Sequence, residues 1–337
     1  MSRAVEVAIA GRKLSLTNLD KVLYLDAGFT KAQVIDYYTR IASVMLPHLE
    51  DRPITLKRYP NGSGGMFFYE KRCPVYRPDW VQTATIAVKS GSIDFCIVDG
   101  VPTLAWLANL ACLEIHTYLY RSAHPDVPTS MVFDLDPGAP AALLDACRIG
   151  LQLRRLLADH GLACVAKTSG SKGLHVHVPL NPRGRGAPSF EDTKDYAHTV
   201  ALAMERRFPD QVTSVMAKAE RPGKVFIDWS QNDRSKTTCC VYSLRAQPRP
   251  TVSAPVTWAE IERAVTRGDA GGLVREADAV LARASQEGDL FADVERLTQP
   301  LRRAPSAVSP GRAAAAPSAR SGRPSPSKKP LRIPQRR

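Results

Sequence analysis

Three acidic residues follow apolar runs in a way that suits divalent-metal chemistry. Asp134 and Asp136 end the run SMVFDLD (130–136), and residues two apart in a strand share one face of the sheet. Their carboxylates could therefore bind the same pair of Mg²⁺ or Mn²⁺ ions, which prefer oxygen ligands. Asp228, in KVFIDWS (224–230), could supply a third carboxylate. Taken singly, the first pair equally suits a strand end with two solvated acids, and a lone Asp is more often a structural cap.

A small, Gly-rich segment, TSGSKGLHVH (168–177), is typical of phosphate binding. Its glycines let backbone amides approach phosphate oxygens, and Ser171 and Lys172 add a hydroxyl and a positive charge. The segment joins two strand-like runs and opens no helix, which separates it from a P-loop. His175 and His177 alternate onto one face. We interpret His175 as a phosphate contact and His177 as packed or solvated, and the alternatives are a plain hairpin and a histidine metal site.

Alternating strands and helices are predicted to position these groups. The strand-like runs are TLKRY (55–59), MFFYE (66–70), SMVFDLD (130–136), CVAKTS (164–169), LHVHVPL (174–180) and KVFIDWS (224–230). Apolar residues at helical spacing cover 30–46, with Thr30 as the N-cap, and also 139–160, 189–208 and 258–265. The pattern predicts an α/β (α+β) domain in which strands carry the acidic residues.

The positive charge is concentrated at the end of the chain. The net charge is +13, but ten Lys and Arg residues and no acids lie from Arg302 onward, which leaves 36 bases against 33 acids before them. The Pro/Ser/Arg-rich residues 303–337 contain too few large apolar side chains to bury a core, so we predict a disordered tail there. Residues 1–302 are predicted to form the folded catalytic domain.

The composition also predicts the compartment. The seven cysteines are odd in number and form no C-x-x-C pair, so we expect neither a zinc knuckle nor a disulfide framework. Reduced thiols in a cytoplasmic protein are the simple interpretation. The sequence has no run approaching the roughly 18 apolar residues of a membrane span, and its N-terminus has no secretion signal, so no membrane partner is expected.

Several distinctive strings occur together in the order of a known family. They are LTNLDKVLY (16–24), FFYEKR (67–72), LEIH (113–116), VFDLDP (132–137), TSGSKGLH (168–175), VFIDWSQN (225–232) and YSLR (242–245). With these strings the chain resembles the polymerase domain of bacterial ligase D, a member of the archaeo-eukaryotic primase superfamily, from about residue 14 to residue 291. The resemblance implies a primase-polymerase-like fold with a central mixed or antiparallel sheet, flanked by helices.

The resemblance also implies roles for individual residues. The catalytic metal ligands would be Asp134, Asp136 and Asp228. The nucleotide would be bound by Lys57, Phe68, His116, Ser171, Lys172, His175, Gln231 and Arg245. DNA would be contacted by Phe67, which stacks on bases, and by Asn18, Lys21 and Lys31, which match the region that recognises a 5′-phosphate across a gap. Without the resemblance, Lys21 and Lys31 would be solvated lysines, His116 a core histidine and the two Phe residues packed strand residues.

The implied activity is template-directed polymerisation that extends primer 3′ ends and fills short gaps in non-homologous end joining. Two divalent ions, Mn²⁺ by preference or Mg²⁺, would be the cofactors, and NTPs would be favoured over dNTPs. The implied partners are DNA with gaps or breaks, Ku and a separate DNA ligase, in the nucleoid-associated cytoplasm. The alternatives are a primase that starts chains without a primer and a non-catalytic DNA-end-binding factor. A glycosyltransferase using the Asp-x-Asp pair is a more distant one.

Overall fold

The larger sheet of the computed structural model carries the acidic strand in its middle. The structure describes residues 4–184 and 186–302, so the predicted tail lies outside the described residues. The strand order is β13-β14-β10-β12-β11-β16, with β13 parallel to β14 and all other neighbours antiparallel. The bounds are β10 Ser130–Pro137, β11 Val165–Thr168, β12 Leu174–Pro179, β13 Val212–Thr213, β14 Val225–Asp228 and β16 Pro255–Val256. The predicted mixed central sheet is confirmed.

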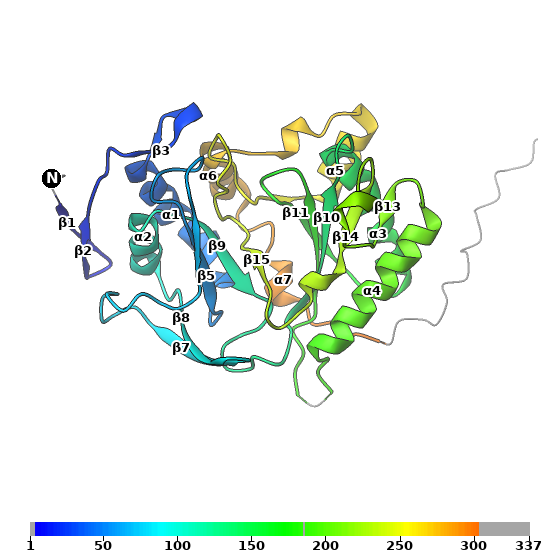
Figure 1. The fold of residues 1–337 in the computed structure, drawn as a ribbon, viewed down its shortest axis with the longest axis horizontal. Helices are drawn as coiled ribbons and strands as arrows, with labels where there is room; N and C mark the ends of the chain where they lie inside the picture. Colours follow the sequence, from blue (N-terminus) through cyan, green and yellow to red (C-terminus); the bar gives the residue numbers. More distant parts are fainter. Residues whose placement is uncertain (1–3, 185, 303–337) are drawn as a thin grey trace, which may run out of the picture. The chain divides into compact units, whose positions relative to one another are not determined.

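Helices cover the apolar face of this sheet (Figure 1). They are α3 (Leu143–Asp159), α4 (Phe190–Arg207) and α5 (Trp258–Arg267). Gly150 of α3 lies so close to Leu135 and Leu174 that an added Cβ would meet a Leu174 methyl at 2.8 Å. Because side chains alternate along a strand, Asp134 and His175 must then point to the opposite face.

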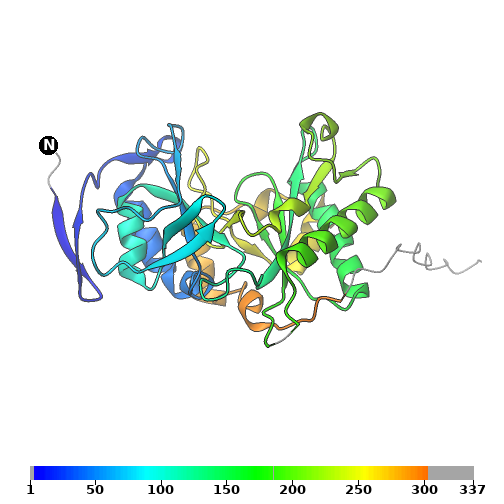
Figure 2. The ribbon, with the colours of Figure 1, turned by 60° about the horizontal axis from the view of Figure 1, so that its bottom comes forward.

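A smaller sheet, ordered β15-β9-β5-β6, stands beside the first (Figures 1 and 2). Its strands are β5 Ile54–Arg58, β6 Phe68–Glu70, β9 Cys112–Tyr118 and β15 Thr237–Cys239. The helices α1 (Lys31–Met45), α2 (Val101–Asn109) and α6 (Ala277–Glu287) share a hydrophobic core with it. Leu56 and Ile115 are buried in that core, so the alternate residues of β5 and β9 face the other way.

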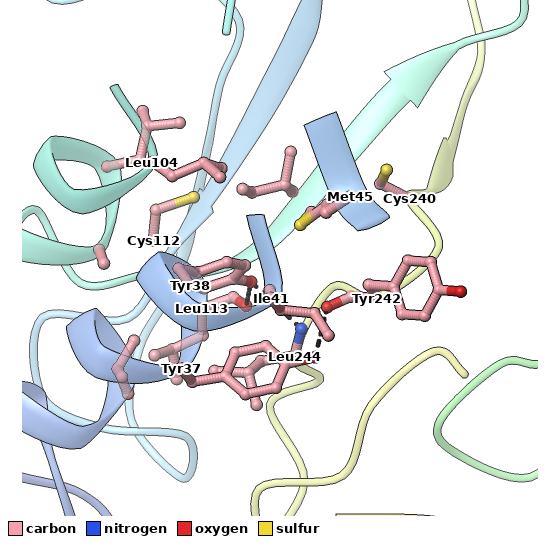
Figure 3. Close-up of a cluster of buried hydrophobic side chains, with 14 of the residues drawn as sticks. Tyr37, Tyr38, Ile41, Met45, Leu104, Cys112, Leu113, Cys240, Tyr242 and Leu244 are labelled. Carbon is pink, nitrogen blue, oxygen red and sulfur yellow. Dashed lines mark hydrogen bonds between the residues drawn. The ribbon is translucent and has the colours of Figure 1, made fainter. Parts of the chain in front are cut away.

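Helix α1 starts as predicted and holds a distant segment in place (Figure 3). Thr30 caps it in a capping box with Gln33. Further along, the hydroxyl of Tyr37 donates a hydrogen bond to the carbonyl of Tyr242 at 2.7 Å. The Tyr38 hydroxyl donates to the Leu113 carbonyl at 2.7 Å and accepts from the Leu244 amide at 3.1 Å. These bonds fix the segment that leads from β15 to Arg245.

In residues 4–184 and 186–302, three two-stranded hairpins and a short α-helix lie outside the two larger sheets. The hairpins are β1 (Val5–Ile9) with β2 (Arg12–Leu16), β3 (Val22–Tyr24) with β4 (Phe29–Thr30), and β7 (Thr83–Val88) with β8 (Gly91–Cys96); α7 spans Asp293–Arg296. None of the helices in the described part of the chain is long and apolar enough to cross a bilayer.

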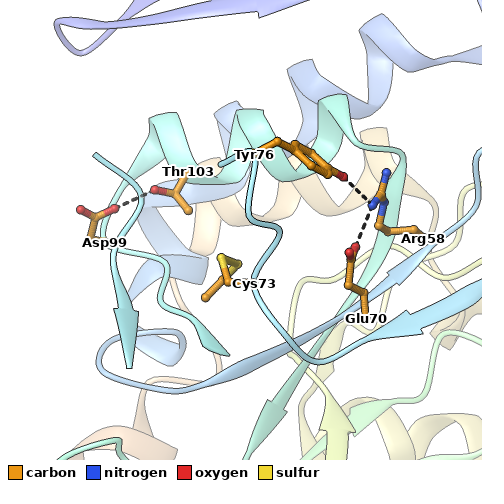
Figure 4. Close-up of a disulfide and its surroundings, with 7 residues drawn as sticks. Arg58, Glu70, Cys73, Tyr76, Asp99 and Thr103 are labelled. Carbon is orange, nitrogen blue, oxygen red and sulfur yellow. Dashed lines mark hydrogen bonds and ion pairs between the residues drawn. A yellow bond between two sulfur atoms is a disulfide. The ribbon is translucent and has the colours of Figure 1, made fainter. Parts of the chain in front are cut away.

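A disulfide between Cys73 and Cys96 corrects the expectation that all thiols are reduced (Figure 4). It joins the loop after β6 to the end of β8, and the Cys73 amide also donates to the Asp94 carbonyl at 2.7 Å. Sequence spacing failed here because the two cysteines, 23 residues apart, meet through the β7–β8 hairpin and form no recognisable motif. The other five cysteines are free.

Candidate active site

The open face of the larger sheet carries a row of ionisable side chains on four adjacent strands. The strand registers pair Lys167 of β11 with His175 of β12, His175 with Asp134 of β10, and Asp134 with Asp228 of β14. Cross-strand partners lie within about 4.5–5.5 Å of each other at Cβ, so neighbours in this row interact directly. Asp134 and Asp228, both predicted metal ligands, are therefore brought together, and Asp136 lies two residues further along β10.

Asp134 has an unfavourable environment for a carboxylate. Burial and the nearby charges of Asp228 and Asp136 raise its pKa to about 7, although Lys167 and Arg245 act in the opposite direction. His175 Nε2 lies 3.4 Å from Asp134 Oδ1. Burial, together with the Lys167 charge, holds the pKa of His175 well below its ordinary value. Because burial and the neighbouring carboxylates both disfavour the ionised form of Asp134, a cation beside it would be stabilised.

The other two aspartates are engaged by protein groups. Asp136 pairs with Lys172 Nζ at 3.0 Å and with Arg221 at 3.7 Å. Asp228 accepts bonds from Ser230 and from Gln231 Nε2, the latter at 3.0 Å. Consequently, among the described residues no three Asp, Glu, His or Cys side chains are grouped closely enough to hold a metal ion as they stand.

The Gly-rich segment forms a tight turn between β11 and β12, as its sequence predicts. Ser169 Oγ accepts the amides of Ser171 and Gly173 at 3.2 and 3.0 Å, which orders the turn. An added Cβ at Gly173 would lie 2.6 Å from the Leu135 carbonyl oxygen, and one at Gly170 would meet Arg245 and the backbone of Val252. The glycines are thus required for close packing of the turn against β10 and the Arg245 segment.

A cleft of about 570 Å³ separates the two sheets. Six of the predicted nucleotide-binding residues line it together with Asp134 and Asp136, namely His116, Ser171, Lys172, His175, Gln231 and Arg245. On the smaller sheet, the registers place Thr55 and Cys239 on either side of His116. Arg245 reaches across, because its Nη1 donates to the Ser169 carbonyl at 2.8 Å. Lys57 and Phe68 do not line the cleft.

Lys57 instead contacts a buried acid beneath the cleft wall, Glu114. This residue is 1% exposed, and its carboxylate lies 3.4 Å from Lys57 Nζ, 2.9 Å from His116 Nε2 and 3.5 Å from Arg245 Nε. Burial raises the pKa of Glu114, but His116, Arg245 and Lys57 outweigh it, so that the pKa lies far below its ordinary value. Glu114 is therefore an ionised carboxylate that holds three predicted nucleotide-binding residues.

Three aromatic residues follow one another just before and at the start of β6. Phe67, Phe68 and Tyr69 are all about half exposed. Tyr69 pairs in register with Lys57 and lines the cleft, whereas Phe68 pairs with Arg58 and, by alternation along the strand, points to the opposite face. Phe67 contacts the Tyr69 ring edge-on and lies 4.5 Å from Lys57 Nζ. The aromatic strip thus continues from the cleft to the outer surface.

Asn18, Lys21 and Lys31 form a separate cluster at the start of α1. Asn18 and Lys21 are exposed, whereas Lys31 is 5% exposed, so the interpretation of Lys31 as a solvated lysine is wrong. Lys31 Nζ donates to the Thr17 carbonyl at 2.6 Å. Burial, and then the charges of Lys21 and Arg58, lower the pKa of Lys31 to about 8. Such a concentration of positive charge favours an anion.

The sequence reasoning missed several polar residues of the site. Glu114 was visible only as the neighbour of His116 in the string LEIH, and Lys167 only as a charged residue inside a buried strand. Lys167 is 1% exposed, and its Nζ donates to His175 Nδ1 at 3.1 Å and to Ser253 Oγ at 2.6 Å. Burial lowers the pKa of Lys167 to about 8. A charged residue at a core position of a strand is the signal that could have identified both.

Comparisons with known proteins agree on one family. The family model "LigD, primase-polymerase domain" matches residues 30–291. The LigD end-joining repair protein of Mycobacterium tuberculosis is 42% identical over 290 residues, which cover 83% of this chain and 37% of that protein. The bifunctional LigD of Bacillus subtilis is 32% identical over 287 residues, 85% of this chain and 45% of that protein. The chain thus spans less than half the length of these relatives.

Among solved structures, the chain is similar to the polymerase domain of M. tuberculosis ligase D in complex with DNA. The TM-score is 0.77 at 40% sequence identity, and the match covers 85% of this chain and 99% of that one.

Proposed function

This chain belongs to the LigD primase-polymerase family, and on that premise we propose that it is a template-directed nucleotidyltransferase that extends primer 3′ ends at gaps and breaks. The observation that carries the proposal is the row of Asp134, Asp228 and His175 on one open sheet face. Asp134 and His175 line a cleft whose other residues include the hydroxyls and cations that suit a phosphate, and Asp228 lies beside Asp134 on the neighbouring strand. This arrangement suits a substrate that carries a triphosphate and a metal.

Asp134, Asp136 and Asp228 would hold two divalent ions, Mn²⁺ or Mg²⁺. The donor set fits such ions because all three are hard oxygen ligands, and because a cation would stabilise the ionised form of Asp134, whose pKa is raised by burial and by the charges of Asp228 and Asp136. When bound, the ions would activate the primer 3′-hydroxyl and stabilise the leaving pyrophosphate. Lys172 and Arg221 would then leave Asp136 and become available to phosphate oxygens.

The protein groups around the metal ligands would orient the substrate. Ser171, Lys172 and Arg245 would contact the triphosphate, and Gln231 would contact the nucleotide from its place beside Asp228. His175 would donate from Nε2, because its Nδ1 accepts a hydrogen bond from Lys167. Phe67, Phe68 and Tyr69 offer rings on which bases can stack without sequence preference. Asn18, Lys21 and Lys31 would bind the 5′-phosphate on the far side of a gap.

We place this activity in non-homologous end joining, with Ku and a DNA ligase as partners, because the relatives are end-joining proteins. The test is primer extension on a gapped duplex with Mn²⁺, comparing NTPs with dNTPs, with a parallel reaction that contains template but no primer. We expect addition that requires a primer and favours NTPs.

Asp134→Ala and Asp136→Ala should abolish addition while DNA binding persists, because phosphate contacts elsewhere hold the duplex. Asp36→Ala, which alters an exposed acid on α1, is the matched control. Wild-type rates in either cleft variant would contradict the metal assignment.

A further inference from the structure

The buried acid beneath the cleft wall, Glu114, meets different partners at its two carboxylate oxygens. Glu114 Oε1 accepts a hydrogen bond from the Ala246 amide at 3.1 Å and from the Tyr59 hydroxyl at 3.4 Å. Oε2 faces His116 Nε2 at 2.9 Å, and Lys57 Nζ reaches both oxygens at 3.4 and 3.5 Å. The two carboxylate oxygens therefore have different tasks, since Oε1 meets backbone and hydroxyl donors and Oε2 meets the imidazole.

The contact at Oε2 determines which nitrogen of His116 carries the proton. An ionised carboxylate can only accept hydrogen bonds, so His116 Nε2 must be the donor. Burial lowers the pKa of His116, which leaves the ring neutral and Nδ1 without a proton. Within the described residues, no protein group donates to Nδ1, and His116 lines the cleft. His116 therefore presents an acceptor to whatever binds there.

An acceptor selects its ligand by chemistry. Phosphate oxygens are themselves acceptors, so an unprotonated Nδ1 repels them and takes a hydroxyl or an amino group instead. The triphosphate has its own cations on the other wall of the cleft, at Lys172 and Arg245. The part of a nucleotide that carries hydroxyl donors whatever its base is the sugar. Building on the proposed function, we infer that Glu114 is a positioning residue that fixes His116 as the acceptor for a sugar hydroxyl and so makes the site select its nucleotide.

The variant Glu114→Gln tests this directly. Its side-chain amide can keep the contacts of Oε1 and reverse the direction of the hydrogen bond between Oε2 and His116. Its carbonyl oxygen can still accept from Ala246 and Tyr59, which places the NH₂ group against His116. That group is a donor, so His116 Nε2 becomes the acceptor and the proton moves to Nδ1. The imidazole would then offer a donor to the cleft. One substitution thus reverses the hydrogen-bonding character of His116 without removing the ring.

The first measurement is ¹⁵N NMR of histidine-labelled protein, with the His116 signal assigned by its loss in His116→Gln. The wild type should show a neutral ring protonated at Nε2, and Glu114→Gln should show protonation at Nδ1. The decisive spectrum is that of the wild type, so it does not depend on whether Glu114→Gln folds. A wild-type His116 ring protonated at Nδ1, or at both nitrogens, would overturn the inference. This readout is also independent of catalysis, so it holds even if the protein added no nucleotide, a result that would refute the proposed function alone.

The second measurement is kcat/KM for an NTP, its 2′-deoxy analogue and its 3′-deoxy analogue. In Glu114→Gln the preference for the NTP over one of the analogues should fall by roughly five- to tenfold, the worth of one hydrogen bond. The analogue whose disadvantage shrinks identifies the hydroxyl. An equal loss for all three nucleotides, or no loss, would contradict the inference.

A matched control exists elsewhere in the chain. Glu295 is also a mostly buried carboxylate, paired with Arg52 at 3.0 Å, with Arg121 at 2.9 Å and with His48 at 3.5 Å, but it does not line the cleft. Glu295→Gln should lower the melting temperature to a comparable degree and leave the discrimination between the three nucleotides unchanged. If Glu295→Gln changed the discrimination as much as Glu114→Gln, a general loosening of the fold would explain both results, and the inference would fail.

Discussion

At the scale of single residues, the charge on Asp134 links stability to metal binding. Its pKa is about 7 in the folded protein, against an ordinary value near 3.8. The folded state therefore holds a proton that the unfolded chain releases, so stability of the metal-free protein should fall as pH rises from about 4 to about 7. A divalent ion offsets the ionised carboxylate above that range. We expect Mn²⁺ to raise the melting temperature by roughly 2–5 °C at pH 8 and by less at pH 6.

The control for this prediction is Asp134→Asn. Without its ionisable group, the metal-free protein should be more stable than the wild type at pH 8, and Mn²⁺ should add little. Differential scanning fluorimetry of both proteins, with and without Mn²⁺ at the two pH values, makes the comparison. An equal Mn²⁺ effect in the wild type and the variant would show that the ion binds elsewhere.

The aromatic residues of β6 should separate into two functions. Tyr69→Ala removes a ring from the cleft, and we expect kcat/KM for the nucleotide to fall by roughly tenfold or more, since stacking on one base is worth about 1–3 kcal/mol. Phe68→Ala removes a ring from the opposite face, so it should instead raise the Kd for DNA. Extension kinetics under saturating DNA and a fluorescence anisotropy titration distinguish the two effects. Identical kinetic defects in both variants would contradict the assignment of faces.

The candidate site was predictable from sequence to the extent that its residues follow strand alternation. Asp134 and Asp136 share a face for that reason, and Ser171 and Lys172 sit in the turn that their small neighbours predicted. The partners of Glu114 were not predictable, because they are cations from β5 and from the segment after β15, far apart in sequence. A local pattern carries no information on which distant charges will meet.

At the scale of elements, the start of α1 gives the clearest prediction. Lys31 is held by the Thr17 carbonyl, and no carboxylate among the described residues pairs with it. Its charge and that of Lys21 should attract a 5′-phosphate, which is a dianion. A gap with a 5′-phosphate should therefore bind more tightly than one with a 5′-hydroxyl, by roughly tenfold for about 1–2 kcal/mol. Gel-shift titrations with both substrates measure this.

Lys21→Ala is the informative variant here, because Lys21 is exposed and its loss should not disturb the core. It should reduce the preference for the 5′-phosphate and leave binding of the 5′-hydroxyl substrate nearly unchanged. Lys13→Ala, an exposed lysine on β2, is the matched control. Equal affinity of the wild type for the two substrates would remove the 5′-phosphate role.

The elements themselves were predicted unevenly. The helix expected over 30–46 is confirmed because its cap and its apolar spacing agree. Four strands of the larger sheet, β10, β11, β12 and β14, occur where their apolar runs predicted them, whereas the two-residue strands β13 and β16 were missed. The helix expected from residue 139 begins at Leu143, because the preceding residues form a turn and Ala142 is extended. Helix α2 was missed, since its almost wholly apolar sequence has no helical periodicity to detect.

At the scale of the whole molecule, the charge asymmetry of the sequence predicts how DNA affinity depends on salt. Residues 303–337 carry nine Lys and Arg residues and no acids. Each phosphate that they neutralise should steepen the log–log salt dependence by about 0.9. A chain ending at residue 302 should bind DNA more weakly at low salt, with a shallower slope, and keep its rate at saturating DNA. Superimposable slopes for the two chains would show that these residues touch no phosphate.

The segment from β15 to Ser253 ties the two sheets together in a way that bears on how the protein unfolds. On one side, α1 holds the segment through Tyr37 and Tyr38 (Figure 3). On the other, Arg245 and Ser253 bond to β11 and the turn after it. Neither sheet can lose its structure without breaking the contacts of the other, so both should melt in one cooperative transition. In native-state hydrogen exchange, the amides of Tyr242 and Leu244 should consequently be among the slowest to exchange, opening only when the whole domain does.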